Sequence, residues 1–232
     1  KAVESDIAAI EAAGANWYPL ALARELEDAI LSMRTNELDI GVWLIKTEGD
    51  AKAVLQMDEV LQQHATHWFV RETVGLLRRT FSRLDVSSRS LFALIEPGSC
   101  FAGTFLELAL ACDRSYMLAL PDDEARAPTI AVGETNFGLY PMATGQSRLQ
   151  RRFYNEQPAL DAVRSKAGQA LDADAAFATV DFDAGAGVGA GVFPASRSSI
   201  SSNADASARI SIGWVPLWNA FKRIGSILPA VG

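Results

Sequence analysis

The sequence has little cysteine and histidine, no long apolar run and no excess of positive charge. Its 232 residues include two cysteines and two histidines, which form neither a disulfide framework nor a paired-cysteine zinc motif. The net charge of −7 argues against sequence-independent binding to nucleic acid, which needs a basic face. No apolar run approaches the roughly 18–20 residues that a membrane-spanning helix needs. This composition favours a protein of the reducing cytoplasm, with neither nucleic acid nor membrane as a partner.

The length and the apolar content are those of an ordinary globular domain. Of the residues, 49% are hydrophobic, which is enough for a sizeable core. The first residues, KAVESDIAAI, are neither a secretory signal nor a transit peptide, and they lack an initiator Met. We therefore expect one domain with an appendage, taken from a longer chain.

Segments with helical periodicity alternate with short continuous apolar runs. Residues 20–36 and 68–84 repeat apolar side chains at helical spacing, whereas residues 40–45 and 91–95 are apolar runs of strand length. This alternation predicts the α/β fold class, with right-handed crossovers and a mostly parallel sheet. The expected strands are 40–45, 91–95, 115–120 and 129–133. The expected helices are 6–13, 20–36, 51–63, 68–84, 104–112, 147–154 and 159–177.

The composition changes after about Ala178. Residues 179–208 are rich in Gly, Ala and Ser and show almost no apolar periodicity, so they cannot bury enough surface to offset chain entropy. We therefore predict a folded domain of residues 1–178 and an irregular tail of residues 179–232. Apolar content returns over residues 210–228, and residues 218–227 are a candidate docking helix.

The segment IEPGSCFAGTFLELALACD, residues 95–113, carries most of the functional signal. Small residues follow an apolar run and open into an apolar helix, whose first N–H groups can hold an anion. Thr104 and Glu107 are three positions apart and share a helical face. An oxyanion over Thr104 would therefore lie near the Glu107 carboxylate, which suits acid/base chemistry on a carbonyl compound. Glu107 could equally be a core carboxylate with a buried partner, and the glycines could serve only tight packing.

The longer block IEPGSCFAGTFLELALACDRSYM resembles the signature of the crotonase (enoyl-CoA hydratase/isomerase) superfamily, and AVGETNFGLYPMATGQSRL resembles its second motif. The resemblance implies a ββα spiral in which two backbone N–H groups hold the thioester oxygen of an acyl-CoA. By motif position it implies catalytic roles for Glu107 and Glu134, which should face one shared cavity. It also implies an oxyanion or substrate-binding loop that contains Thr104, Gly103 and Cys100. CoA enters only as part of the substrate, and neither a separate cofactor nor a metal is implied.

Residues 1–177 are most similar to the second half of a superfamily member that has two crotonase-like halves in one chain. The similarity is specific over residues 16–154. It implies hydrolytic opening of an epoxidised benzoyl-CoA ring, with release of formate and an aldehyde product. The implied partners are an aromatic acyl-CoA, an N-terminal crotonase-like half that is missing from this sequence, and further copies of the chain in a homo-oligomer.

Two departures from the superfamily pattern keep other functions open. The usual triple glycine is here Gly103-Thr104-Phe105, whose side chains crowd the place of a thioester. The residues after the first apolar run, TEGDAKAVLQMD, contain no recognisable second oxyanion donor. The alternatives are an enoyl-CoA hydratase-like enzyme and a non-catalytic half that supports a catalytic one. We expect little or no lyase activity from this chain alone.

Other chemically capable side chains have ordinary explanations too. His64 and His67 have the spacing of a metal pair, but surface or interface histidines show the same spacing. Cys100 could be a nucleophile at a helix start or a small packed thiol. Three arginines could meet CoA phosphates or form a solvated helix face: Arg148, Arg151 and Arg152.

Overall fold

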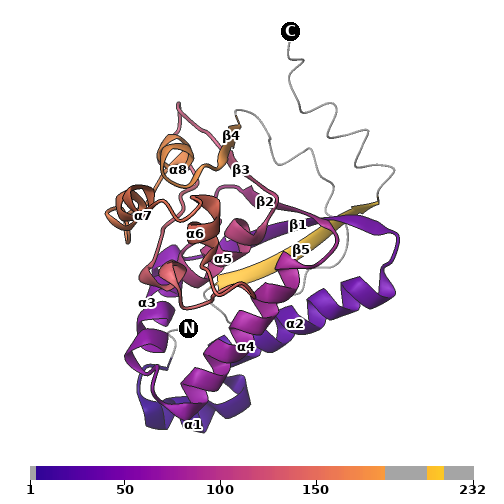
Figure 1. The fold of residues 1–232 in the computed structure, drawn as a ribbon, viewed down its shortest axis with the longest axis vertical. Helices are drawn as coiled ribbons and strands as arrows, with labels where there is room; N and C mark the ends of the chain where they lie inside the picture. The colour runs from indigo at the N-terminus through magenta and orange to yellow at the C-terminus, as the bar shows by residue number, and fades with distance from the viewer. Residues whose placement is uncertain (1–3, 186–207, 217–232) are drawn as a thin grey trace.

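The apolar runs of the sequence form the centre of a five-stranded sheet (Figure 1). The computed structural model describes residues 4–185 and 208–216. Four strands are parallel neighbours, and the fifth runs antiparallel along β1, so that the sheet order is β4-β3-β2-β1-β5. The strands are β1 (Ile40–Gly49), β2 (Ser90–Ile95), β3 (Arg114–Leu118), β4 (Asp183–Gly185) and β5 (Ala208–Pro216).

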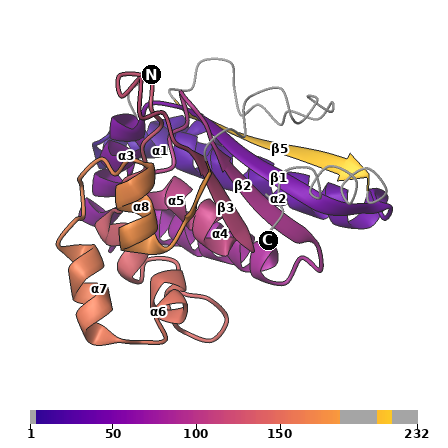
Figure 2. The ribbon, with the colours of Figure 1, turned by 90° about the horizontal axis from the view of Figure 1, so that it is seen from above.

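Helices fill the connections between the parallel strands. Figures 1 and 2 show α2 and α4 side by side along the sheet, with α6, α7 and α8 gathered on the side away from β5. The helices are α1 (Ile7–Ala13), α2 (Tyr18–Asn36), α3 (Ala51–Gln63), α4 (Trp68–Asp85), α5 (Gly103–Ala111), α6 (Arg148–Arg152), α7 (Gln157–Arg164) and α8 (Ala173–Val180). Two short 3₁₀ turns complete the described part: η1 (Gly14–Asn16) and η2 (Glu134–Phe137).

Helix α5 is the centre of the core. Its sequence, GTFLELALA, is apolar on every face except for Thr104 and Glu107, and all residues from Gly103 to Leu110 are buried. A helix that is apolar all round is stable only when other elements surround it. Helices α3 and α4 and the three strands β1, β2 and β3 all contact α5. The helix that carries the predicted site is therefore interior.

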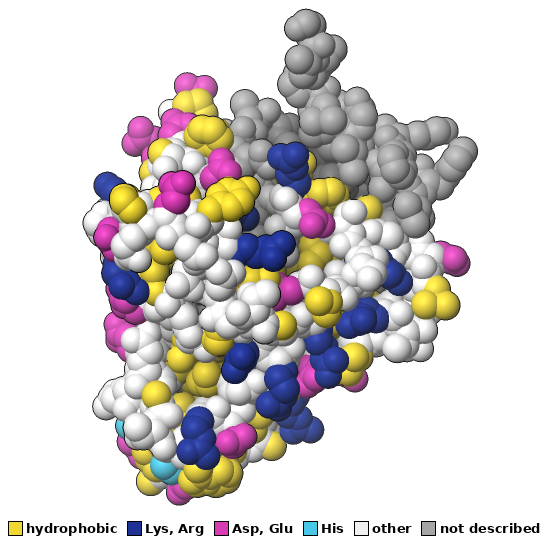
Figure 3. Space-filling model, viewed as in Figure 1, with side chains coloured by type: hydrophobic (Ala, Val, Ile, Leu, Met, Phe, Trp, Pro, Cys, Tyr) yellow, Lys and Arg dark blue, Asp and Glu magenta, His cyan; other side chains and the backbone are white. Residues whose placement is uncertain are grey.

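The outer face of α4 is basic even though the chain has a net charge of −7. Figure 3 shows Lys and Arg side chains gathered over the region of α4 in this view. The arginines of α4 are Arg71, Arg78, Arg79 and Arg83. The electrostatic potential near such a surface can be positive although the net charge of the chain is negative.

None of the helices in the described part of the chain is both long enough and apolar enough to cross a membrane.

The α/β class predicted from the sequence is confirmed, and three of the four expected strands are present as β1, β2 and β3. The strand expected over residues 129–133 is wrong. This segment makes only single bridges, between Ala131 and Ala102 and between Ile130 and Leu171. It turns into η2 directly afterwards, so no ladder of strand length can form.

The single helix expected over residues 159–177 is also wrong, because α7 and α8 divide it. Gly168 lies between them with a φ of +78°, and its N–H donates to the carbonyl of Val132 at 2.8 Å. A left-handed glycine stops a helix at little steric cost.

Two segments of the predicted irregular tail are strands, which corrects the prediction there. Residues 183–185 and 208–216 are strands β4 and β5, so segments beyond residue 178 complete both edges of the sheet. The alternating sequence Arg209-Ile210-Ser211-Ile212 buries Ile210 and Ile212, as a half-covered strand requires. Residues 186–207 and the candidate docking helix at 218–227 lie outside the described residues.

We predict that Tyr18 anchors β5. The Tyr18 hydroxyl donates to the carbonyl of Ala208 at 2.8 Å, and burial raises the pKa of this phenol. Tyr18→Phe should lower the free energy of unfolding by about 1 kcal/mol and speed amide exchange in β5, because the carbonyl loses its donor. Urea unfolding and hydrogen exchange measure both effects. Tyr154→Phe is the matched control, since Tyr154 is 88% exposed. Equal stability and equal exchange in the two variants would contradict the anchoring role.

Candidate functional site

A carboxylate from α3 closes the N-terminus of α5. Asp58 is 3% exposed, and it accepts the backbone N–H of Thr104 at 2.8 Å. It also accepts the hydroxyl of Thr104 and, at 2.9 Å, the hydroxyl of Thr135. The Thr104 hydroxyl has a single hydrogen, which it uses in the hydrogen bond to Asp58. The Tyr140 hydroxyl, 2.9 Å away, must therefore be the donor in its hydrogen bond with Thr104. Two elements, α5 and η2, therefore direct neutral donors toward one buried carboxylate.

Gly103 permits this close approach. Its φ is +44°, and a Cβ at this position would overlap Oδ2 of Asp58. The N–H of Gly103 donates to the carbonyl of Ala131 at 3.0 Å. The two backbone N–H groups that open α5 are thus both engaged inside the protein, one by Ala131 and the other by Asp58.

Burial controls the ionisation of Asp58. The pKa of this carboxyl is raised to about 7, mainly by desolvation, and the nearby carboxylate of Glu107 contributes to the rise. The hydrogen bonds from Thr104 and Thr135 act in the opposite direction and favour the charged form. No arginine or lysine hydrogen-bonds to Asp58 within the described residues, so neutral donors alone hold the charge.

Glu107 lies one helical turn further and has charged and amide partners. It is 1% exposed, and its Oε1 accepts Nδ2 of Asn136 at 2.7 Å while its Oε2 accepts Nη1 of Arg148 at 2.7 Å. Burial raises the pKa of Glu107, although Arg148 and Asn136 oppose the shift. Arg148 also makes two hydrogen bonds to Asp85, of 2.7 and 3.1 Å. Glu107 is therefore a core carboxylate with buried partners on both oxygens.

Glu134 lies in a different environment. Its side chain is 57% exposed and forms an ion pair of 3.6 Å with Arg164. The next two residues of η2, Thr135 and Asn136, point inward and contact Asp58 and Glu107 instead. The structure does not bring Glu107 and Glu134 into one cavity, so that expectation is wrong. The assignment of catalytic roles to the two glutamates stays a prediction.

The other predicted site residues are packed or separately paired. Cys100 is buried, and burial raises the pKa of its thiol to about 11, so the thiolate needed by a nucleophile is disfavoured. His64 Nε2 lies 2.8 Å from the carbonyl of Ser5, whereas His67 lies 3.4 Å from Glu11. No cluster of three or more His, Cys, Asp or Glu side chains suited to a metal occurs among the residues that the structure describes.

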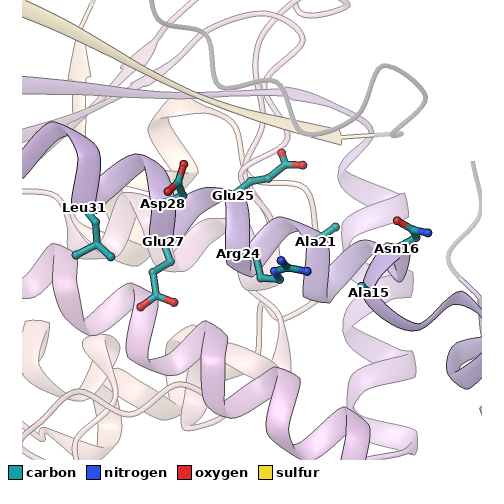
Figure 4. A pocket seen from close by; sticks show the side chains of 8 residues that line it. All are labelled: Ala15, Asn16, Ala21, Arg24, Glu25, Glu27, Asp28 and Leu31. Carbon is teal, nitrogen blue, oxygen red and sulfur yellow. The ribbon is translucent and has the colours of Figure 1, made fainter.

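One cavity lies away from Asp58 and Glu107, whereas another is lined by Asp85 and Arg148 of the Glu107 network. The first, of about 610 Å³, runs along η1 and α2, where Arg24, Glu25, Glu27 and Asp28 line it (Figure 4). Its excess of carboxylates disfavours CoA phosphates.

The three arginines singled out in the sequence line a second cavity, of about 430 Å³. Two of them also bond within the fold. Arg148 binds Asp85 and Glu107, and Arg152 donates to the carbonyls of Val180 and Asp181, both at 3.1 Å. These two guanidinium groups therefore stabilise the fold, and the alternative of a purely solvated helix face does not describe them.

Sequence reasoning missed Asp58, although the signal was present. Helix α3 has an apolar stripe at positions 54, 57 and 61, and Asp58 lies within that stripe. An acidic residue on the buried face of a helix needs donors from elsewhere in the fold.

Comparison with known proteins supports the predicted resemblance. No family model matches the sequence. Over 165 residues the chain is 56% identical to the benzoyl-CoA-dihydrodiol lyase of Aromatoleum evansii, a match that covers 71% of this chain and 29% of that relative. The chain thus spans less than a third of the curated relative. The resemblance to such a two-halved enzyme, predicted to be specific over residues 16–154, is confirmed over the matched residues.

Two solved structures are also similar to most of this chain. Pseudomonas aeruginosa AtuE is 17% identical with a TM-score of 0.49, over 72% of this chain and 61% of that one. The enoyl-CoA hydratase of Bacillus halodurans is 18% identical with a TM-score of 0.48, over 70% of this chain and 61% of that one.

We predict that Arg148 is essential for stability. Its side chain is 2% exposed and pairs with two carboxylates, so Arg148→Ala leaves the buried Glu107 without its cation. The free energy of unfolding should fall by about 3–5 kcal/mol, measured by urea denaturation. Arg164→Ala removes an ion pair whose side chains are 51% and 57% exposed, and it should cost at most about 1 kcal/mol. Similar losses in the two variants would contradict the importance of the buried network.

Proposed function

We propose that this chain is the second crotonase-like half of a benzoyl-CoA-dihydrodiol lyase-like enzyme, and that it supports the catalytic half without performing the chemistry itself. The identity of 56% to the lyase supports the assignment to that enzyme. The supporting role rests on one observation. Every group that the chemistry would need at α5 is already bonded inside the protein, since Asp58 holds the Thr104 N–H while Asn136 and Arg148 hold Glu107.

The energetic argument concerns the oxyanion. Acyl-CoA chemistry of this type needs preorganised N–H donors near the thioester oxygen, and loss of one donor costs on the order of 10²–10³ in rate. Here Thr104 donates to Asp58, and Gly49 at the end of β1 donates to the carbonyl of Gly98 at 3.0 Å. Helix α3 begins at Ala51 directly after its cap, Asp50, which leaves no loop between β1 and α3 to supply another donor. Among the described residues, neither of the two backbone N–H groups expected to form the oxyanion hole is free to bind a thioester oxygen.

In the whole enzyme we propose hydrolytic opening of an epoxidised benzoyl-CoA ring with release of formate. The partners that we propose for this chain are the N-terminal crotonase-like half and further copies of the protein in a homo-oligomer. The aromatic acyl-CoA would bind to the catalytic half. We propose the cytoplasm as the compartment.

Formate release tests this division of labour. The isolated chain should turn over the epoxide of benzoyl-CoA at least about 10²-fold more slowly than a full-length protein that includes the upstream half. In the full-length protein, Glu107→Gln and Glu134→Gln should leave kcat within about two-fold of the parent. Comparable rates from the isolated chain and the full-length protein would refute the supporting role. So would a large loss of kcat in either folded glutamine variant, which would return the chemistry to these glutamates.

A further inference from the structure

Asp58 on α3 has surroundings that differ from those of the buried Glu107 on α5 and the partly buried Asp85 on α4. Glu107 and Asp85 share the guanidinium of Arg148. In the described part of the chain, Asp58 has only neutral hydrogen-bond donors, which come from the start of α5 and from η2. A buried charge that is held by an N–H group and hydroxyls, without a cation, has the surroundings of a bound anion.

The surrounding geometry fits a carboxylate closely. Gly103 is the residue whose Cβ would overlap Oδ2 of Asp58, so glycine at this position makes room for the carboxylate. A second glycine, Gly133, packs behind it, since a Cβ there would lie 3.1 Å from Cα of Gly103. Thr104, Thr135 and Tyr140 are all at most 2% exposed. The space is therefore enclosed and lined with donors.

We propose that Asp58 is a tethered internal ligand of an anion site formed by the Thr104 N–H and the hydroxyls of Thr104 and Thr135. The carboxylate of Asp58 occupies the site permanently, and it excludes carbonyl and carboxylate ligands from solution. Tyr140 supports the site indirectly, because its hydroxyl donates to Thr104 and leaves the Thr104 proton directed at the carboxylate. The chain thus carries a closed site where an open one would bind an acyl group.

The proposal predicts how the site behaves when its ligand is removed. Asp58→Ala deletes the carboxylate and leaves its donors facing an enclosed space of about the same size. Buried donors without a partner are costly, so the variant should be less stable than the parent. A small carboxylate from solution should fill the space, and formate is the smallest. Among the described residues, the carboxylate of Glu107 is close enough to disfavour a negative charge in this space.

The experiment measures melting temperature in sodium formate against sodium chloride at equal ionic strength and pH 8. Formate should raise the Tm of Asp58→Ala saturably, by roughly 3–6 °C at about ten times its Kd for a chain of this size. Asp172→Ala is the matched control. It removes an aspartate that caps α8 at an exposed position, where no enclosed site remains. The parent and Asp172→Ala should respond equally to the two salts.

Each outcome decides the proposal. An equal effect of formate on all three proteins, or no effect on any, overturns it. If Asp58→Ala is unfolded in chloride, formate should restore its near-ultraviolet circular dichroism, and failure to do so counts against the proposal. The double variant Asp58→Ala with Thr135→Val should gain less from formate than Asp58→Ala, because one donor is missing. The readout is stability and not turnover, so its result is independent of the lyase proposal.

Discussion

The bond between the Asp58 carboxylate and the start of α5 is the contact on which the rest of the site depends. Helix α5 is surrounded on all sides, so water cannot satisfy its first N–H groups. A carboxylate at a helix N-terminus satisfies the N–H of Thr104 and interacts favourably with the helix dipole. Once Asp58 is fixed there, the orientation of Thr104 is fixed as well, and so are the hydroxyls of Thr135 and Tyr140.

The second charge in α5 requires a separate solution. Glu107 is held by Arg148 and Asn136, and Arg148 extends the network to Asp85 at the end of α4. Asn136 links the two clusters, because its amide also donates to the carbonyl of Gly103 at 2.8 Å. Asp58 and Glu107 could both take part in acid/base chemistry, but the network makes them components of the core. This is the physical basis for assigning a supporting role to the chain.

Sequence patterns predicted the elements that depend on local periodicity. The spans 20–36, 51–63 and 68–84 match α2, α3 and α4 because each carries a regular apolar face. The strand β5 was missed because its register depends on β1, which lies more than 150 residues earlier in the chain. The division between α7 and α8 was missed because the left-handed Gly168 is held by a distant carbonyl, that of Val132.

The candidate site was also predictable only in the features that depend on local sequence. Position in the motif identified Thr104 and Glu107, which do lie together at the start of α5. It could not show which partners they bond to, since Asp58, Asn136 and Arg148 come from three other segments. The exposed position of Glu134 depends on a short 3₁₀ turn that directs Thr135 and Asn136 inward. Chemistry-bearing residues can thus be read from a sequence, whereas their availability depends on long-range contacts.

Calorimetric titration of the isolated chain with benzoyl-CoA tests the central claim most directly. The site at α5 is filled by Asp58, so the account predicts no saturable binding beyond that of CoA alone, which serves as the control. Saturable one-to-one binding of benzoyl-CoA that free CoA does not reproduce, and that Thr104→Pro abolishes in a folded variant, would contradict the account. It would show that the N–H of Thr104 is available to an acyl group.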